Sequence, residues 1–531
     1  MTKPAKLAWP IEPLEYQTLP DAFNIVSLLV DRHLEAGAGE REALLHPGGS
    51  VTYQDLWEAV NRVAHLVRTL GVEPEQRVLL LLPDSPEFVY LFLGAMKAGA
   101  VPVPVNTLAA ADEHEYCLRD SRAKLLVTHA SLYEKVEGVW QGIPGLRASV
   151  VVGGAPAGCL AFETLHAAQP AFFDPAATHK DDMAYWLYSS GTTGQPKAVV
   201  HLHHDMVFCI DSYARHVLAM TAEDRTFAVP RLFFSYGLGC CLYLPLWCGG
   251  SAVLLPERPS PAGVFEAIER YRPTLFFSVP TSYAALLREA EGRDPDLSSL
   301  RLAISAGEPL PAPLYLRWMD RFGVELLDGL GATEVGYIYI SNRPGAVRPG
   351  SSGQLLPGYE ARILDGEGRE VGPDEVGDLW MKGESVAAGY WNQHPKTRAT
   401  FVGEWYWTGD RYTRDADGCY FYQGRADDLL RVGGQWVSPL EVESALLEHR
   451  AVAECAVVGG MDTDGLEKPH AYVVPRPGEV TDGLEETLRA HVQARLAPFK
   501  VPRWVSVVAE LPKTATGKIQ RFKLRGIDAP R

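Results

Sequence analysis

Short apolar runs that alternate with helix-like stretches constrain the fold of this chain more than any other feature. Arg77–Leu82 (RVLLLL) has the composition of a buried strand, and Glu87–Ala98 follows with helical periodicity and ends at Gly99. Val101–Val105 and Ala123–Thr128 repeat the strand-like composition. This alternation predicts an α/β fold in which helices cover mostly parallel sheets.

The middle of the chain continues the alternation and then departs from it. Strands are predicted at Thr226–Val229, Ser251–Leu255, Thr274–Val279 and Leu302–Ser305, with helices at Pro261–Tyr271 and Thr281–Glu291. Beyond residue 350, short strands such as Tyr359–Leu364 and Gly377–Lys382 are separated by Gly, Pro and Asp turns. This change predicts a small antiparallel β subdomain.

A second change in pattern comes near Gly424. The 531 residues exceed what one hydrophobic core usually supports. We therefore expect a large N-terminal domain over residues 1–423 and a small, mobile α+β domain over 424–531. In the latter, helices are predicted at Leu440–Glu448 and Leu484–Arg495, and strands at Val452–Val458 and His470–Val474.

Composition disfavours several classes of function. The formal net charge of −16 opposes non-specific binding to phosphate backbones, so nucleic acid is not an expected partner. No apolar run is long enough to span a bilayer, and Met1–Pro20 lacks the pattern of a signal peptide. The eight cysteines form no CxxC pair, which suits reduced thiols. We therefore expect a cytoplasmic protein without a membrane partner.

The strongest local motif is Tyr188–Val200, YSSGTTGQPKAVV, which follows the strand-like run Ala184–Leu187. Its small residues expose backbone N–H groups, and its lysine closes a loop that can wrap around phosphate oxygens. The GxxxxGK[ST] spacing of a Walker A loop is absent, which disfavours a P-loop kinase or ATPase. SSGTTG alone is also compatible with a flexible surface turn.

Four further motifs follow in order. They are Asp328–Glu334 (DGLGATE), Tyr406–Asp410 (YWTGD), Gly424–Glu443 (GRADDLLRVGGQWVSPLEVE) and Pro512–Lys523 (PKTATGKIQRFK). The glycines of the first let the backbone approach a flat ring, its Thr can bind a phosphate and its Glu can bind Mg²⁺. An Asp beside Gly suits ribose hydroxyls. Taken singly, the first motif is equally compatible with a helix N-cap, the second with a turn and the third with a charged linker, and the fourth alone favours a solvated tail.

Taken together and in this order, the five motifs resemble the adenylate-forming superfamily of acyl-CoA synthetases, luciferases and peptide-synthetase adenylation domains, over most of the chain. The resemblance implies ATP, Mg²⁺ and coenzyme A as cosubstrates. It implies that Thr333 contacts phosphate, that Glu334 binds the metal, and that Asp410 and Arg425 hold the ribose. The remaining ATP-binding residues that it implies are Ser189, Ser190, Gly191, Thr192, Thr193, Gly194 and Lys197 at the phosphates, and Ala306, Gly307, Glu308, Pro309, Asp328, Gly329 and Leu330 beside the adenine.

The same resemblance implies three roles in the small domain. Asp427 lies at the hinge, and Gly434 lies where the pantetheine arm of CoA passes. Lys518 bridges the carboxylate and the α-phosphate during adenylation. The thiol-transfer step no longer needs this lysine, so a domain that swaps faces between the two steps explains its place on a mobile element.

The acid pocket is predicted from Arg231–Gly239 (RLFFSYGLG), which resembles the acyl-pocket motif of benzoate and 4-hydroxybenzoate CoA ligases. Aromatic walls with glycines suit a flat ring. The implied lining residues are Ser235, Tyr236, Gly237, Gly331, Tyr337 and Ile338, and the alternative is plain core, which we expect for Phe233. The resemblance continues in Pro280–Leu287, Ser305–Pro311 and Ala387–Gln393.

This sequence departs from the family pattern at several positions. Tyr337 stands where benzoate ligases often carry His, so its phenol would shrink the pocket or bond a ring substituent. Ala198 replaces the usual Gly after Pro-Lys, Arg431 a common Lys and Gly433 a common Ser. With these changes, the sequence supports the adenylation step more strongly than the transfer of the acyl group to CoA.

The expected function is an aryl-CoA ligase that acts on benzoate, 4-hydroxybenzoate or a similar aromatic acid, as a monomer or a homodimer. The alternatives are a 2-aminobenzoate–CoA ligase, an acid–AMP ligase that loads a carrier-protein thiol, and a binding protein with a degenerate site. The intact motif residues oppose the last alternative. We expect His201, His203 and His204 to be structural or phosphate-adjacent rather than metal ligands, and Cys240 and Cys241 to be packing residues.

Overall fold

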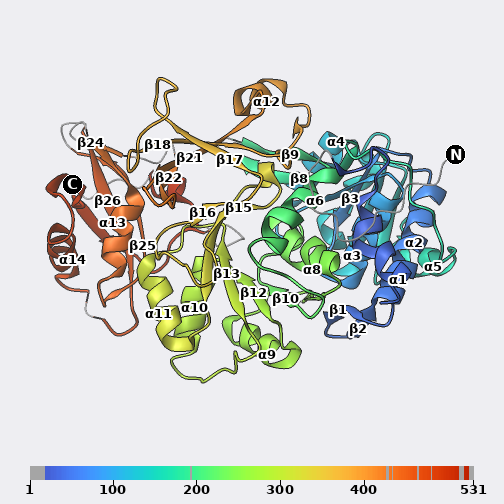
Figure 1. Ribbon diagram of the computed structural model, residues 1–531, viewed down its shortest axis with the longest axis horizontal. Helices are drawn as coiled ribbons and strands as arrows, with labels where there is room; N and C mark the ends of the chain where they lie inside the picture. The colour runs from blue at the N-terminus through green and yellow to red at the C-terminus, as the bar shows by residue number, and fades with distance from the viewer. Residues whose placement is uncertain are drawn as a thin grey trace.

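A computed structural model describes residues 18–191, 194–425, 430–432, 435–462, 466–479, 481–513 and 519–525. Its larger sheet has the order β16-β15-β14-β13-β12-β10-β11-β1-β2, parallel from β14 to β1 and antiparallel at both edges (Figure 1). The strands are β1 (Glu42–His46), β2 (Gly49–Thr52), β10 (Arg225–Ala228), β11 (Ser251–Val253), β12 (Leu275–Ser278), β13 (Leu302–Ala306), β14 (Leu326–Gly331), β15 (Ile338–Ser341) and β16 (Gln354–Leu355). The predicted parallel sheet is confirmed.

A second parallel sheet precedes it in sequence, in the order β4-β3-β5-β6-β7. Its strands are β3 (Arg77–Leu81), β4 (Val101–Pro104), β5 (Leu125–His129), β6 (Ala148–Val152) and β7 (Leu160–Ala161), and its helices are α2 (Tyr53–Thr69), α3 (Pro86–Lys97), α4 (Ala111–Ser121) and α5 (Phe162–Ala167). Helix α2 begins at a capping box, in which Thr52 and Asp55 each accept the other's backbone N–H at 3.1 Å.

Helices cover both faces of the larger sheet, and the alternation of strand side chains divides its core in two. Along β12, Phe276 packs with α9 (Pro261–Tyr271), α10 (Pro280–Glu289) and α11 (Ala312–Phe322). Its neighbours Leu275 and Phe277 belong to the other core, which includes α6 (His203–Cys209) and α8 (Leu244–Cys248). The predicted helix Pro261–Tyr271 matches α9 at both ends.

The antiparallel part lies above the larger sheet in Figure 1. The hairpin of β8 (Met183–Gly191) and β9 (Gly194–Leu202) is joined by β19 (Gly389–Tyr390). Beside it, β17 (Glu360–Leu364), β18 (Gly377–Lys382), β20 (Phe401–Val402), β21 (Trp405–Arg414) and β22 (Tyr420–Arg425) form an antiparallel sheet, with α12 (His394–Thr400) next to β20. The predicted β subdomain is confirmed.

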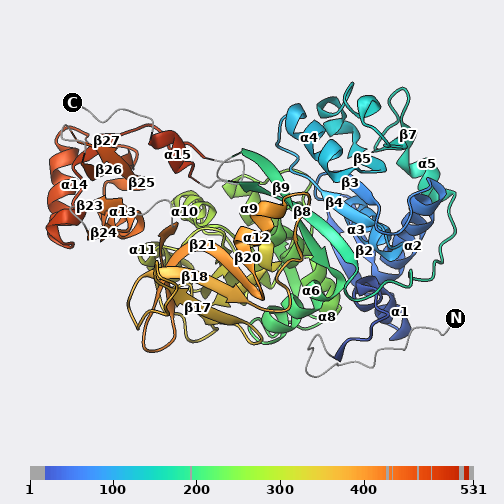
Figure 2. The same ribbon diagram turned by 90° about the horizontal axis from the view of Figure 1, so that it is seen from above.

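The C-terminal domain has a core of its own, built from residues such as Val442, Leu446, Val457, Val473 and Leu488. Its elements are β23 (Leu430–Val432), β24 (Gln435–Val437), α13 (Pro439–Leu447), β25 (Val452–Met461), β26 (Glu467–Pro475), α14 (Leu484–Gln493), β27 (Trp504–Val507) and α15 (Arg521–Leu524). Figure 2 places it at the opposite end of the molecule from the first parallel sheet. Its boundary near residue 424 stays a prediction.

The search for a membrane span concerns the same described residues. None of their helices combines the length and the apolar character that crossing a bilayer requires.

Candidate active site

The motif predicted as a phosphate loop is a β-hairpin. Ser189 pairs with Lys197 and Gly191 with Gly194, so both arms of the motif are strand. In these arms, antiparallel pairing uses backbone N–H and C=O groups in hydrogen bonds between the two strands. Thr192 and Thr193, at that tip, lie outside the described residues. Lys197 lies on β9 and its side chain is 14% exposed.

A buried ion cluster, formed by Lys197, Glu334 and Tyr390, lies beside this hairpin. The Lys197 Nζ is 2.8 Å from Glu334 Oε1 and donates to the Tyr390 hydroxyl at 2.7 Å. That hydroxyl donates to Glu334 Oε1 at 2.9 Å, and the Ser189 hydroxyl approaches the same oxygen at 3.5 Å. Lys197, Tyr390 and Ser189 therefore all converge on one oxygen of the Glu334 carboxylate.

The charge of Glu334 is set by this cluster. Burial alone would raise its pKa, but the Lys197 ammonium and the hydrogen bonds from Lys197 and Tyr390 outweigh burial, so the pKa is lowered from its ordinary value. The carboxylate is therefore ionised at neutral pH. An ionised carboxylate oxygen is one of the ligand types that Mg²⁺ takes, together with nucleotide phosphates and water.

The backbone of Thr333 and Glu334 is held by a histidine. The two residues open a 3₁₀ turn (Thr333–Val335) after β14, and the Thr333 carbonyl accepts a 2.7 Å hydrogen bond from His201 Nε2. The Nδ1 atom of the same ring lies 2.6 Å from the Asp205 carboxylate, and the ring is fully buried. His201 is thus a support of the turn that carries Glu334.

The other two histidines of the trio have structural surroundings as well. The Nδ1 of His203 accepts the backbone N–H of Ile25 at 3.4 Å, and burial lowers its pKa to about 3. His204 contacts the carbonyls of Lys180 at 3.1 Å and Glu384 at 2.9 Å. Among the described residues, no group of three His, Cys, Asp or Glu side chains is placed to bind a metal on its own.

Asp410 and Arg425 meet across two neighbouring strands. They are register partners on β21 and β22, and the Arg425 Nη1 lies 3.1 Å from Asp410 Oδ1 and from the Thr408 carbonyl. The structure therefore brings together the two residues predicted to hold the ribose.

The residues predicted beside the adenine lie at the carboxyl ends of adjacent parallel strands. Ser305 of β13 pairs with Asp328 of β14, and Ala306 pairs with Gly329, so Ala306–Pro309 and Asp328–Leu330 share one edge of the sheet. Ligands of open α/β sheets bind at such edges. Burial raises the pKa of Asp328 well above its usual range, and its carbonyl accepts from Asn342 Nδ2 at 3.3 Å.

The residues predicted for the acid pocket gather around one aromatic ring. Tyr213, Tyr236, Tyr243 and Tyr337 form a tyrosine cluster, in which the Tyr337 ring centre lies 5.7, 6.1 and 5.9 Å from those of the first three. The predicted residues Ser235 and Gly237 belong to helix α7 (Ser235–Leu238), and Gly331 and Ile338 flank Tyr337 on β14 and β15. Phe233 is buried, as expected of core.

Tyr337 fits its place closely and without polar partners. The residue is 2% exposed, and its hydroxyl makes no hydrogen bond of ordinary geometry with the described residues. A Cβ on Gly239 would lie 2.2 Å from Tyr337 Cε2, so only glycine leaves room for this ring. By contrast, the Tyr236 hydroxyl donates to the carbonyls of Ser278 at 3.2 Å and Ile304 at 3.0 Å.

Three predicted site residues lie outside the described part of the chain together with the hairpin tip. They are the hinge residue Asp427, the CoA-binding residue Gly434 and the adenylation lysine Lys518. One residue of the site, Tyr390, was missed. It lies in the AAGYWNQ stretch, where the phenol next to Gly was the available signal.

Comparisons with known proteins agree on the family of this fold. The model of the family described as "AMP-binding enzyme" matches residues 31–391, and that of the "AMP-binding enzyme C-terminal domain" matches residues 441–518. A benzoate–CoA ligase of Thauera aromatica is 46% identical over 96% of this chain and 96% of that protein. A 4-hydroxybenzoate–CoA/benzoate–CoA ligase of Rhodopseudomonas palustris is 44% identical over 95% of this chain and 94% of that protein. The crystal structure of the anthranilate CoA ligase AuaEII in complex with anthranoyl-AMP superposes with a TM-score of 0.93, at 42% identity over 96% of this chain and 98% of that one.

Proposed function

The chain belongs to the AMP-binding enzyme family, and on that basis we propose that it is an ATP-dependent aryl-CoA ligase. The observation that carries the proposal is the buried Glu334 carboxylate, which Lys197 keeps ionised beside the predicted phosphate hairpin. Named relatives that act on benzoate and 4-hydroxybenzoate support an aromatic acid as the substrate.

In the first half-reaction, a carboxylate oxygen of the acid attacks the α-phosphorus of ATP. An O–P bond forms between the acid and the α-phosphorus, and the bond from the α-phosphorus to the oxygen that bridges it to the β-phosphorus breaks. The products are acyl-AMP and pyrophosphate. Two anions approach each other in this step, so positioned positive charge lowers the barrier. We assign to Lys197 the binding of the ATP phosphates, in exchange for its contact with Glu334.

Glu334 suits Mg²⁺, because this metal is commonly bound by one or two carboxylates together with nucleotide phosphates. When bound, the metal offsets charge on the pyrophosphate that leaves. We propose that Thr333 contacts a phosphate of ATP. The hairpin residues that we propose to bind the ATP phosphates are Ser189, Ser190, Gly191, Thr192, Thr193 and Gly194. Asp410 and Arg425 orient the ribose, and the edge formed by Ala306–Pro309 and Asp328–Leu330 contacts the adenine.

In the second half-reaction, the CoA sulfur attacks the acyl carbonyl, a C–S bond forms, and the bond to the AMP oxygen breaks. We assign Lys518 to the first step only and Gly434 to the passage of the pantetheine arm. Asp427 is the hinge about which the C-terminal domain, residues 424–531, changes its face between the steps.

We propose that the acid binds against the tyrosine cluster. Its proposed lining residues are Ser235, Tyr236, Gly237, Gly331, Tyr337 and Ile338. Benzoate, 4-hydroxybenzoate and 2-aminobenzoate are the candidate acids. The eight cysteines are all free thiols, which supports a location in the reducing cytoplasm. A mass measurement in solution decides between a monomer and a homodimer.

Pyrophosphate release from ATP and Mg²⁺ tests the proposal over a panel of aromatic and aliphatic acids, with and without CoA. We expect steady release with an aromatic acid only when CoA is present. Release that does not respond to CoA would assign the acyl group to another acceptor, such as a carrier-protein thiol. No release with any aromatic acid would contradict the proposed activity.

The Lys518→Ala variant separates the half-reactions. We expect it to abolish adenylation and to retain CoA-thioester formation from supplied acyl-AMP. Equal loss of both steps in a folded variant would contradict the assignment of Lys518 to adenylation alone.

A further inference from the structure

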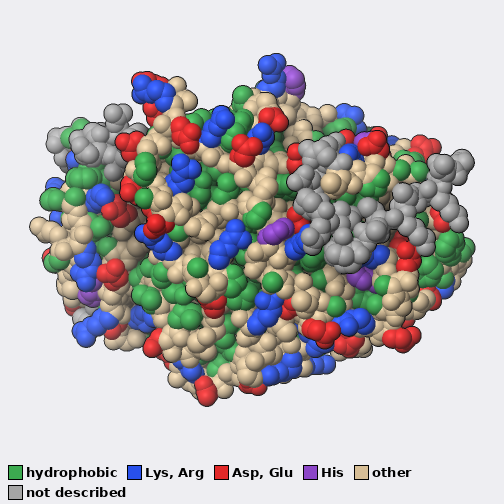
Figure 3. All heavy atoms as spheres, viewed as in Figure 1, with side chains coloured by type: hydrophobic (Ala, Val, Ile, Leu, Met, Phe, Trp, Pro, Cys, Tyr) green, Lys and Arg blue, Asp and Glu red, His purple; other side chains and the backbone are tan. Residues whose placement is uncertain are grey.

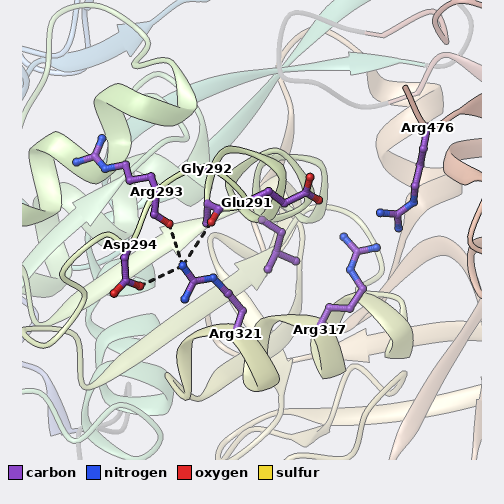
Figure 4. A pocket seen from close by; sticks show the side chains of 9 residues that line it. Glu291, Gly292, Arg293, Asp294, Arg317, Arg321 and Arg476 are labelled. Atoms are coloured by element: carbon purple, nitrogen blue, oxygen red, sulfur yellow. Dashed lines mark hydrogen bonds and ion pairs between the residues drawn. The ribbon is translucent and has the colours of Figure 1, made fainter. Parts of the chain in front are cut away.

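A cavity of about 490 Å³ lies at the junction of α10, α11 and the end of β26. Its charged lining side chains are Glu291, Arg293, Asp294, Arg317, Arg321 and Arg476 (Figure 4). None of them belongs to the candidate active site. Four arginines against two carboxylates give the lining a positive balance in a protein whose formal net charge is −16.

Two of the arginines are already engaged. Arg293 Nη2 lies 2.6 Å from Glu269 Oε2. Arg321 Nη2 lies 3.1 Å from Asp294 Oδ1 and donates to the Arg293 carbonyl at 2.9 Å. These contacts use one carboxylate of the lining and hold two guanidinium groups at the wall.

The other two arginines come from different domains. Arg317 lies on α11 and Arg476 follows β26, and in Figure 4 their guanidinium groups point toward each other. Arg476 Nε donates to the Val452 carbonyl at 3.3 Å. Among the described residues, the Arg317 side chain has neither a hydrogen bond nor an ion pair.

Two facing cations repel each other, and the electrostatics of Arg317 reflect this. Burial lowers the pKa of Arg317 from its ordinary value, and the positive charges of Arg476 and Arg288 lower it further, against the opposite effect of the Glu291 carboxylate. On the face drawn in Figure 3, by comparison, basic and acidic side chains are interspersed. An anion placed between Arg317 and Arg476 would relieve the repulsion between the two guanidinium groups.

We infer that this pocket binds an anion that carries two or more phosphate charges, with Arg317 and Arg476 on opposite sides of it. Guanidinium groups match phosphate oxygens through paired hydrogen bonds, which an isolated chloride cannot use. Because each domain supplies one of the two arginines, the bound anion holds the domains in this arrangement. Pyrophosphate and the phosphorylated adenosine of a CoA-type nucleotide share this chemistry.

Isothermal titration of the full-length protein, without ATP and acid, tests the site with sodium pyrophosphate and with adenosine 3′,5′-bisphosphate. We expect Arg317→Gln and Arg476→Gln each to weaken the tighter probe by about tenfold or more, as loss of a charge-assisted hydrogen bond predicts. Arg369→Gln is the control, because Arg369 is exposed and forms its ion pairs with Asp365 and Glu367 of its own turn, far from the pocket lining in sequence. Binding that only Lys197→Ala removes belongs to the candidate active site. Unchanged affinity in both pocket variants would overturn the inference.

A charge reversal tests the facing geometry separately. Arg476→Glu places a carboxylate opposite Arg317, so we expect it to lose anion binding and to melt, without ligand, at a higher temperature than Arg476→Gln. A lower melting temperature than that of Arg476→Gln would show that the two side chains do not face each other. The probe that binds more tightly to the wild-type protein identifies the source of the anion.

Discussion

The ion cluster and the tyrosine cluster are both buried, but they are stabilised in opposite ways. In the ion cluster, Lys197 and Tyr390 both contact one oxygen of Glu334. In the tyrosine cluster, Tyr337 is held by ring packing and by the space that Gly239 leaves, while its hydroxyl makes no hydrogen bond of ordinary geometry within the described part of the chain. At one end of the candidate site, ion pairing and hydrogen bonds therefore fix the positions of the side chains, and at the other end close packing fixes them.

This difference predicts how each region responds to substitution. A buried charge that loses its partner destabilises the folded protein, and the rate of a reaction that uses this charge falls as well. A packed aromatic region tolerates the loss of an unpaired hydroxyl but not the addition of volume. The predictions below test the contrast, starting with the largest expected effect.

Glu334→Gln is expected to have the largest effect. It removes the negative charge opposite Lys197 and the proposed ligand of Mg²⁺. We expect the rate of acid-dependent pyrophosphate release to fall by about 10²–10³-fold, as for the loss of one preorganised electrostatic group. Glu384→Gln is the control, because that side chain is exposed. A folded Glu334→Gln enzyme with wild-type activity would show that the ion cluster has no part in adenylation.

Gly239→Ala tests the region specified by shape. Its backbone φ of −64° suits alanine, so the effect comes from the methyl group that would lie 2.2 Å from Tyr337 Cε2. We expect the free energy of unfolding to fall by about 1–3 kcal/mol, the usual cost of overpacking, and the preference among acids to change. Chemical denaturation and the acid panel measure both.

Gly366→Ala is the matched control for that substitution, because an added Cβ there has no atom within 4 Å. Equal stability and equal acid preference in Gly239→Ala and the wild-type protein would mean that Tyr337 moves freely. The region would then not be specified by shape.

The sequence could predict features that depend on local patterns, but not contacts between segments far apart in the chain. The strands and helices followed from periodicity, and the predicted strand Gly377–Lys382 matches β18 at both ends. Asp410 and Arg425 were placed together because their motifs carry recognisable residue types. Tyr390 was missed because its role depends on β19 pairing with β9, a contact between segments almost 200 residues apart that local patterns do not encode.

Shape was harder to predict than charge. Gly239 appeared in the sequence only as one glycine of an apolar motif, and its close approach to Tyr337 depends on how the helical turn Gly239–Tyr243 packs against the residue that precedes β15. His201 was expected to be structural, but its contact with the Thr333 carbonyl, 132 residues away, required the fold. Packing contacts of this kind have no fixed spacing in the chain.

Tyr390→Phe is expected to have a moderate effect within the ion cluster. The variant loses the hydroxyl that contacts both Lys197 and Glu334 but keeps their 2.8 Å ion pair. Hydrogen bonds to charged groups contribute about 1.5–3 kcal/mol, so we expect kcat/KM to fall about tenfold. Steady-state kinetics with ATP as the varied substrate measure the change. An unchanged kcat/KM would mean that the ion pair alone positions Glu334.

Tyr337→Phe is expected to have the smallest effect on stability and the sharpest effect on specificity. It is the same chemical change as Tyr390→Phe, made where the hydroxyl forms no hydrogen bond of ordinary geometry with any residue that the structure describes, so the free energy of unfolding should stay the same or rise by less than about 1 kcal/mol. If the proposed acid bonds this hydroxyl through a ring substituent, kcat/KM for 4-hydroxybenzoate or 2-aminobenzoate falls while that for benzoate is retained. A fall of about 1 kcal/mol or more in the free energy of unfolding would show that the Tyr337 hydroxyl is paired after all. The division of the site into a charged end and a shaped end would then no longer hold.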